Sequence, residues 1–353
     1  MKIGKIGPIV SVISIGILLS FLWGSCDKNT QSDKAIEKTF TNPLYSGADP
    51  WLIKHNGLYY YCESRGGITI SRSPMITLKG VSTAVWTPPP TGMNSREIWA
   101  PELHYLNGKW YIYYAADDGQ NKNHRMWVLE SNGDDPQGTY HDRGVLYTGD
   151  DISGKTQNRW AIDGTVMEHK NQLFFIWSGW PSTEDIQYLY IARMDNPWTI
   201  SSSRVLLCDN DTYVWERVSE STNQRGLNEG PEVLMKGDKI FIIYSCSGSW
   251  EITYKLNMLY MNSESDPMNP ESWTKSDTPV FAGTDQVLGV GHASFVKSPD
   301  NIEDWILFHS KVSREPGWDR TVWAQKFTWK ADGSPDFGTP YPAGTSLAVP
   351  SGE

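Results

Sequence analysis

Three carboxylates and a histidine stand at matching places in a motif that the chain repeats five times. The residues that lead the five copies are Asp49, Ala100, Asp163, Glu229 and His292. Equivalent residues converge when repeats close into a ring, so these side chains are expected to share one site. Like charges held together are costly unless a function uses them. Cleavage of a glycosidic bond is such a function, because one carboxylic acid protonates the leaving oxygen while a carboxylate on the opposite face activates water.

A third carboxylate also has a use in this chemistry. Its charge keeps the pKa of the acid high by repulsion, and its oxygens can orient the acid. The chain is also rich in aromatic residues, with 17 Trp, 17 Tyr and 10 Phe. Flat apolar ring faces suit the apolar faces of sugars. The repeated motif therefore combines acids and aromatic rings in the same places.

Each copy of the motif predicts a β-hairpin. The five copies read ADPWLIKHNGLYYYCES, WAPELHYLNGKWYIYYAA, AIDGTVMEHKNQLFFIWSG, NEGPEVLMKGDKIFIIYSCSG and GHASFVKSPDNIEDWILFHS. In each, an apolar strand leads to a Gly, Asn or Asp turn and then to an aromatic-rich strand. A third strand-like segment follows, as in ITISRSP and LYIARMDNP, and most of these segments end in a turn with proline. Period-two alternation dominates, and no long segment has a helical period.

The spacing of the copies predicts the fold. Successive leading residues are 51, 63, 66 and 63 positions apart. Five units of three or four antiparallel strands favour an all-β, five-bladed β-propeller in a single domain. A β-sandwich with unrelated hairpins is the alternative. In a propeller the first strand of each blade lines the central channel, so the leading residues would meet at one mouth of that channel.

Five ordered motifs resemble glycoside hydrolase family 43. They are NPLYSGADP, IWAPELHYLNGKWYIYYAA, WAIDGTV, NEGPEV and GHASFVKSPD, and the resemblance extends over residues 41–344. It implies a five-bladed propeller enzyme that inverts the anomeric centre. It also implies that Asp49 is the general base, Asp163 the pKa modulator and Glu229 the general acid. Inversion requires room for water, with the carboxyl groups of base and acid about 6.5–9.5 Å apart.

Taken singly, each acid has a structural explanation. Asp49 precedes Pro50 in a common turn dipeptide, and Asp163 could cap a strand. Glu229 could be an exposed loop charge, and Glu232 competes with it for the role of acid. Glu232 falls three positions into the strand and matches no other leading acid. The shared register of the three leading acids therefore favours the catalytic interpretation, with Glu229 as the acid.

Three more residues are expected at the site. The resemblance implies that His292 lies beneath the sugar and helps to hold a calcium ion through water; a packed channel histidine without an ion is the alternative. Arg320, in GWDRTVWAQ, resembles the family's late arginine that contacts the sugar, and a surface salt bridge is its alternative. Trp99 is expected to form a wall of the sugar pocket. The chemistry itself requires no cofactor.

A finer resemblance concerns substrate. Gly164 stands where many members of the family have proline, and EIWAPELHYL, HRMWVLES and GWDRTVWAQ resemble the exo-acting α-L-arabinofuranosidase branch. This predicts release of terminal α-L-arabinofuranosyl residues from plant arabinan, arabinoxylan or arabinogalactan-type glycans, with residues 208–226 as a wall of the pocket. β-Xylosidase or endo-arabinanase activity is the alternative within the family. A non-catalytic sugar-binding lipoprotein is the alternative of another class.

The N-terminus predicts export. Lys2 and Lys5 precede an apolar run over residues 9–23, and Gly24-Ser25 leads to Cys26. This resembles a bacterial lipoprotein signal. We therefore expect a signal peptide at residues 1–25, a lipidated Cys26 with a flexible tether at residues 26–40, and the catalytic propeller at residues 41–347. The protein would be anchored in the envelope by lipid alone, at the periplasmic face or the cell surface; an ordinary cleaved signal peptide is the alternative.

The remaining bulk features exclude some partners. The formal net charge is −10 with no basic stripe, which argues against nucleic acid as a partner. Cys62 and Cys246 fall within aromatic strands and are expected to be buried thiols, while Cys208 lies near a loop. An odd number of cysteines after Cys26, without regular spacing, argues against a disulfide framework or a zinc site.

Overall fold

The computed structural model describes residues 38–218 and 225–353, and Lys38–Glu353 forms one compact unit. Regular structure in this part of the chain consists of β-strands and three short 3₁₀ helices. No helix within it is long and apolar enough to cross a membrane. The predicted signal peptide, the lipidated Cys26 and the tether up to residue 37 lie outside the described residues.

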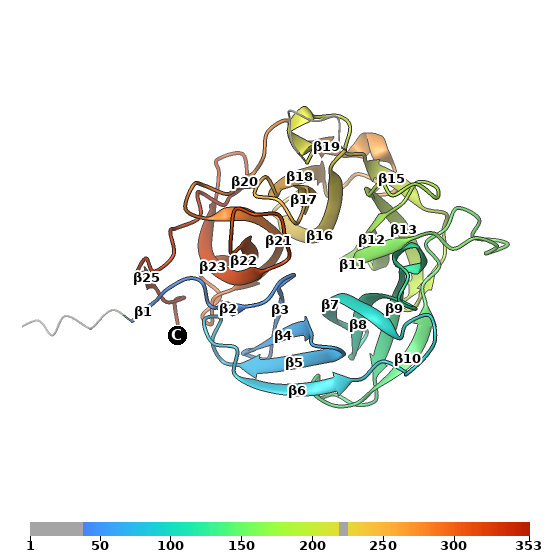
Figure 1. Cartoon of the computed structure of the whole chain (residues 1–353), viewed down its shortest axis with the longest axis horizontal. Coiled ribbons are helices and arrows are strands. Elements are labelled where there is room, and N and C mark those ends of the chain that lie inside the picture. The colour runs from blue at the N-terminus through green and yellow to red at the C-terminus, as the bar shows by residue number, and fades with distance from the viewer. Residues whose placement is uncertain (1–37, 219–224) are drawn as a thin grey trace, which may run out of the picture. The chain divides into compact units, whose positions relative to one another are not determined.

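Five antiparallel sheets stand in a ring (Figure 1), which confirms the predicted five-bladed β-propeller. Blade I contains β3 (Trp51–His55), β4 (Leu58–Ser64), β5 (Ile68–Ser73) and β6 (Val81–Trp86). Blade II contains β7 (Arg96–Leu106), β8 (Lys109–Asp117), β9 (Arg125–Ser131) and β10 (Tyr140–Val145). Blade III contains β11 (Ala161–His169), β12 (Gln172–Gly179), β13 (Tyr188–Asn196), β14 (Thr199–Ile200) and β15 (Val205–Cys208). Blade IV contains β16 (Leu227–Lys236), β17 (Lys239–Ser247), β18 (Lys255–Asn262), β19 (Thr274–Lys275) and β20 (Phe281–Ala282). Blade V contains β21 (Leu288–Lys297), β22 (Asp304–Lys311), β23 (Arg320–Trp329) and β24 (Pro335–Asp336).

Blade V is completed by residues from the start of the propeller unit. β2 (Tyr45–Ser46) pairs antiparallel with β23, and β1 (Thr39–Phe40) pairs with β25 (Leu347–Ala348). The N-terminal segment thereby joins the first and last blades and closes the ring. The strand β1 also corrects the predicted tether. Thr39 and Phe40 belong to the propeller unit because their backbone groups pair with the other end of that unit.

The predicted hairpin turns follow from glycine and asparagine at the tips. In blade I, Asn56 and Gly57 have φ values of 49° and 77° and join His55 directly to its partner Leu58. Two successive residues with positive φ make the turn whose twist matches that of the flanking strands. Glycine adopts this conformation without steric cost, and asparagine tolerates it.

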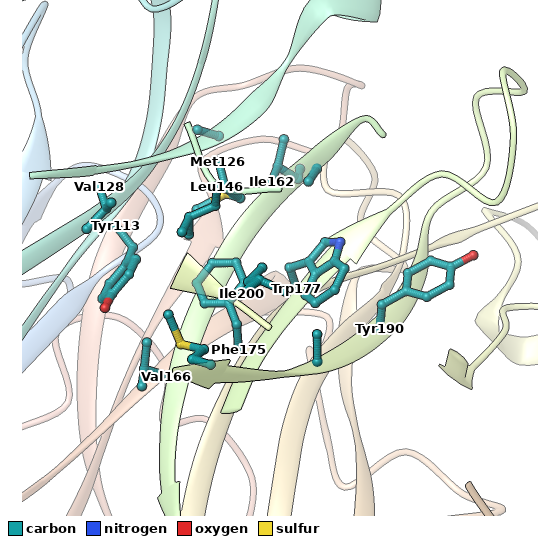
Figure 2. Close-up of a cluster of buried hydrophobic side chains, with 14 of the residues drawn as sticks. Tyr113, Met126, Val128, Leu146, Ile162, Val166, Phe175, Trp177, Tyr190 and Ile200 are labelled. Carbon is teal, nitrogen blue, oxygen red and sulfur yellow. The ribbon is translucent and has the colours of Figure 1, made fainter. Parts of the chain in front are cut away.

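The hydrophobic core lies between neighbouring blades. One cluster joins Tyr113 and Met126 of blade II to Phe175 and Trp177 of blade III (Figure 2). Burial of one such side chain stabilises the fold by about 1.5–3 kcal/mol. Gly164 takes part by having no side chain, because a Cβ there would lie 2.1 Å from the Phe175 ring. Most tryptophans pack within or between blades, which leaves a few to form the site.

Candidate active site

The leading residues of four blades share one unusual backbone conformation. The φ values are 48° at Asp49, 39° at Ala100, 52° at Asp163 and 48° at His292. In blades II, III and V this residue falls where the pairing of the first strand with the second strand is interrupted by a bulge. A left-handed conformation costs a non-glycine residue energy, and bulges re-aim side chains at functional sites. The left-handed conformation and the bulges therefore explain how the side chains of the leading residues converge as predicted.

Glu229 departs from this pattern, and its predicted register is wrong by one residue. In blade IV the left-handed residue is Gly230, with φ 56°. Glu229 instead pairs with Ser245 before the bulge, as Trp99 pairs with Ala115 in blade II. The fourth copy has one more residue between its acid and its turn, and this shifted the alignment.

Glu232 also differs from expectation, because it has an acidic counterpart in another blade. Glu232 pairs with Ile243 just after the bulge of blade IV, as Glu102 pairs with Tyr113 in blade II. Both carboxyl groups are buried, and Thr165 donates a hydrogen bond of 3.5 Å to Glu232. Glu229 lines the cavity described next and Glu232 does not, so the choice of Glu229 over Glu232 stands on geometry rather than on register.

A cavity of about 950 Å³ brings together all six side chains expected at the site. They are Asp49, Trp99, Asp163, Glu229, His292 and Arg320. Three further tryptophans, Trp160, Trp250 and Trp318, line the same cavity, together with the polar residues Glu97, Asp185, Gln187, Arg225 and Ser249. Arg225 and Gly226 come from the segment expected to form a wall, of which residues 219–224 lie outside the described part.

Asp49 is surrounded by cationic and imidazole nitrogens. Its Oδ1 lies 3.3 Å from Nδ1 of His292, 3.3 Å from Nδ1 of His309 and 3.4 Å from Nη1 of Arg320. Desolvation would raise the pKa of Asp49, but the charge of Arg320 and the neighbouring His292 outweigh it and hold the pKa well below the usual carboxyl range. About a quarter of the Asp49 side chain (26%) is exposed, so a water molecule can reach it. The arrangement favours an ionised Asp49.

Asp163 and Glu229 have the opposite surroundings. Both are buried, and the pKa of Asp163 is raised well above its usual range by burial and by the charges of Glu229 and Asp49. Burial and the charge of Asp49 raise the pKa of Glu229 to about 7. Asp163 Oδ2 accepts a hydrogen bond of 3.1 Å from the Gly230 N–H. Repulsion within the pair is mutual, so its two protons leave in separate steps and the last one leaves at about pH 7 or above.

Trp99 is held as one wall of the cavity. Its ring stacks on His124 with centroids 3.9 Å apart, and its Nε1 donates to Glu97. Behind it, His124 Nδ1 lies 3.0 Å from Asp117 Oδ2 in a fully buried pair. Trp318 lies on another part of the wall and is 62% exposed. The cavity thus presents separate aromatic surfaces, which suits a ligand with apolar faces.

Arg320 does form an ion pair, but not on the surface. Its side chain is 14% exposed and its partner is Asp49. Its Nε donates to the carbonyl of Trp318, which fixes the guanidinium at the cavity.

Two residues at the site were missed from the sequence, Tyr254 and His309. Neither leads a copy of the motif: Tyr254 contacts Glu229 within blade IV, and His309 contacts Asp49 from blade V.

The calcium site proposed at His292 has no direct ligand shell in the described residues, which contain no group of three or more His, Cys, Asp and Glu side chains suited to a metal. Calcium prefers six to eight oxygen ligands, whereas His292 presents a nitrogen that faces Asp49 and Asp163. These residues do not fit direct calcium binding, and no step below is assigned to a metal. A calcium ion held through water stays a proposal.

A five-bladed propeller whose central cavity combines three carboxylates with aromatic walls has the makeup of a carbohydrate-cleaving enzyme. Comparison with known proteins agrees, because the model of glycosyl hydrolases family 43 matches residues 40–335. The chain belongs to this family, as its motifs predicted.

Named relatives add detail. The chain is 35% identical to the extracellular exo-alpha-(1->5)-L-arabinofuranosidase of Streptomyces avermitilis, over 87% of this chain and 65% of the relative. It is 32% identical to alpha-L-arabinofuranosidase 43 of Humicola insolens, over 84% of this chain and 62% of the relative. The chain therefore spans less than two thirds of the length of these two proteins. The crystal structure of alpha-L-arabinofuranosidase from Lactobacillus brevis superposes with a TM-score of 0.78 at 32% identity, covering 87% of this chain and 98% of that one.

Proposed function

We propose that this protein is an inverting glycosidase that releases terminal α-L-arabinofuranosyl residues from plant arabinan, arabinoxylan or arabinogalactan-type glycans. The observation that carries the proposal is the contrast within one cavity between Asp49, whose pKa is lowered, and the pair of Asp163 and Glu229, whose pKa values are raised. Acid–base hydrolysis needs this combination of one carboxylate and one carboxylic acid at the same pH. The arabinofuranosidase names of relatives similar over most of the chain support the choice of sugar.

The proposed reaction proceeds in one displacement. Asp49 removes a proton from water, and the water oxygen bonds to the anomeric carbon from the face opposite the leaving group. The glycosidic C–O bond breaks as Glu229 passes its proton to the leaving oxygen. Repulsion between Asp163 and Glu229 keeps Glu229 protonated near neutral pH, and Asp163 helps to orient it. Arg320 and His292 orient Asp49 and contact the sugar, and Trp99 forms a wall against it.

Product analysis tests the substrate and the direction of attack. Synthetic aryl α-L-arabinofuranosides and aryl β-D-xylosides separate the proposed activity from that of a β-xylosidase. Linear arabinan releases arabinose alone if the enzyme acts on chain ends, and longer fragments if it acts as an endo-arabinanase. Proton NMR during the first turnover should show the β-anomer of arabinose as the initial product. No hydrolysis of any of these substrates across pH 4–9 would leave the sugar-binding lipoprotein as the better interpretation.

Export with a lipid anchor is part of the proposal. Export is supported by the signal-like N-terminus and by the word extracellular in the name of the Streptomyces avermitilis relative, whereas the lipid anchor is supported by the residues before Cys26 alone. Expression in a bacterium with radiolabelled palmitate should label the wild type but not Cys26→Ser. Recovery of unlabelled wild-type protein in the soluble fraction would favour an ordinary cleaved signal peptide.

A further inference from the structure

His309 joins the backbone of Asp49 to the last blade. It lies on β22 opposite Gly291, and its side chain is fully buried. The Asp49 N–H donates a hydrogen bond of 3.1 Å to His309 Nδ1. Since Nδ1 accepts, the neutral ring carries its proton on Nε2. Burial and the charge of Arg320 lower the pKa of His309 to about 4, which keeps the ring neutral.

Blade IV shows that this bond alone does not require histidine. Ser245 lies opposite Glu229 on β17, at the place that His309 occupies on β22. Its Oγ accepts a hydrogen bond of 2.7 Å from the N–H of His292, the leading residue of the next blade. In both cases the second strand of one blade holds the leading residue of the following blade. A serine suffices for that contact in blade IV, so the imidazole ring of His309 has a further role.

The ring of His309 stacks on Tyr254. Their centroids lie 5.5 Å apart with an interplanar angle of 8°. Tyr254 immediately precedes β18, is buried, and donates a hydrogen bond of 2.8 Å through its hydroxyl to Glu229 Oε1. A Cβ at Gly291 would lie 2.1 Å from the Tyr254 ring, so the absence of a side chain next to His292 makes room for it. One continuous set of contacts therefore runs from Asp49 through the two rings to Glu229.

We propose that Tyr254 and His309 act as one stacked positioning unit that sets the separation of Asp49 and Glu229. His309 fixes the backbone of the base, Tyr254 fixes one oxygen of the acid, and the contact between the rings holds the two at constant distance. This inference rests on the proposed function, because inversion needs base and acid far enough apart to admit water. Displacements of about 1 Å in such a site can cost about 100-fold in rate.

Tyr254 also decides where the acid carries its proton. Its hydroxyl occupies Oε1 of Glu229, which leaves Oε2 as the oxygen that bears the proton and can deliver it. A donated hydrogen bond also favours the ionised carboxylate, so Tyr254 lowers the pKa of Glu229.

Other groups face the same carboxyl. Ser249 and Arg320 also lower the pKa of Glu229, whereas burial and the charge of Asp49 raise it. Asp163 is coupled to Glu229 by mutual repulsion. Because these groups stay in place when Tyr254 alone is changed, loss of its hydroxyl should move the pKa of Glu229 upward.

The test compares Tyr254→Phe, His309→Asn, His309→Leu and the double variant Tyr254→Phe/His309→Leu in the full mature chain, using α-1,5-arabinobiose. Tyr254→Phe should lower kcat by about tenfold, the usual effect of losing a hydrogen bond to a charged group, and move the alkaline limb of kcat/KM to higher pH. His309→Asn keeps an acceptor at the place of Nδ1 and should retain more activity than His309→Leu. The double variant should lose less than the product of the single losses, because the two residues act as a unit.

Phe308→Leu provides the matched control. Phe308 neighbours His309 on β22, is equally buried, and packs against Phe281 and Trp323 instead of the site. It should lower the unfolding temperature without moving either pH limb. Unchanged kcat and pH limbs in Tyr254→Phe, or fully multiplicative losses in the double variant, would overturn the positioning unit.

A second measurement separates this inference from the proposed function. The pKa of Glu229 can be followed by ¹³C NMR of labelled glutamate carboxyls, with Glu229→Gln to assign the resonance. Tyr254→Phe should raise that pKa whether or not a substrate is known. A wild-type protein without hydrolytic activity would sink the proposed function, and an unchanged Glu229 pKa in Tyr254→Phe would sink the contact on which the positioning unit depends.

Discussion

Asp49 and Asp163 start equivalent strands with nearly the same backbone conformation, yet their carboxyl groups differ in charge. Asp49 meets Arg320 and His292, which lower its pKa. Asp163 faces a buried glutamate and accepts the backbone N–H of Gly230, and its pKa is raised. The repeated fold therefore supplies position, and the neighbouring side chains supply protonation state.

The same contrast extends to the groups that hold each carboxyl. Around Asp49 the partners come from blade V and reach across the closure of the ring. Around Asp163 and Glu229 they come from blade IV, through Gly230 and Tyr254.

Removal of either reacting group should have the largest effect. Asp49→Asn and Glu229→Gln are each expected to lower kcat on α-1,5-arabinobiose by about 100- to 10,000-fold, the usual contribution of a general acid or base. Glu229→Gln should keep more activity on an aryl arabinofuranoside whose leaving group needs no protonation. Glu232→Gln, a buried acid that does not line the cavity, is the control and should stay within about tenfold of wild type. Wild-type rates in Glu229→Gln on arabinobiose would show that the acid is another residue.

Arg320→Met should erase much of the difference between the two regions. Arg320 lowers the pKa of Asp49, so its removal raises that pKa and moves the acid limb of kcat/KM to higher pH. We expect a loss of about 100-fold at neutral pH, since the variant also loses a contact to the sugar. An acid limb that stays in place would mean that the limb does not report Asp49.

Asp163→Asn should change the other region. Without Asp163 its repulsion with Glu229 is lost, and the remaining proton is held by Glu229 alone. The alkaline limb should therefore move to lower pH, with a loss of about tenfold at the optimum. A pH profile identical to wild type would show that Asp163 stays neutral throughout and contributes no repulsion.

Trp99→Phe should have the smallest effect and leave both limbs in place. The ring stays as a wall but loses the hydrogen bond to Glu97 and part of its stack on His124. KM should rise a few-fold, consistent with about 0.5–1.5 kcal/mol for an aromatic contact, and kcat should change little. A shift of either pH limb would mean that Trp99 contributes to the protonation of the acids.

The architecture could be predicted because the signals for it are local in the sequence. Each hairpin has its turn residues, such as Asn56-Gly57, and the repeat interval supplies the number of blades. The motif resemblance also identified six side chains that the structure brings into one cavity. The closure of blade V by β2 escaped prediction, since β2 has only two residues, too few for a periodic signal, and lies far from its partner β23 in the chain.

The contacts that set the protonation states of these acids escaped prediction for a related reason. Gly230, rather than Glu229, occupies the left-handed position of blade IV, because the acid of this blade stands one residue earlier than in the other copies, and the motif alignment did not detect this shift. His309 reaches Asp49 across a blade boundary, Tyr254 reaches Glu229 from a loop of the same blade, and no repeat position marks either residue. One signal was available in the second strands. Blade V has His309 at the position where blade IV has Ser245, and a comparison of these strands could have found it.

The pH dependence of wild-type kcat/KM on α-1,5-arabinobiose tests the central claim most directly. Asp49 must be ionised and Glu229 protonated for the reaction. Since the pKa of Asp49 is held below the usual range and that of Glu229 is raised to about 7, activity should persist below pH 4 and decline only at about pH 7 or above. A profile that falls already between pH 4 and 5 on the alkaline side would contradict the account, because both carboxyls would then titrate as ordinary exposed acids.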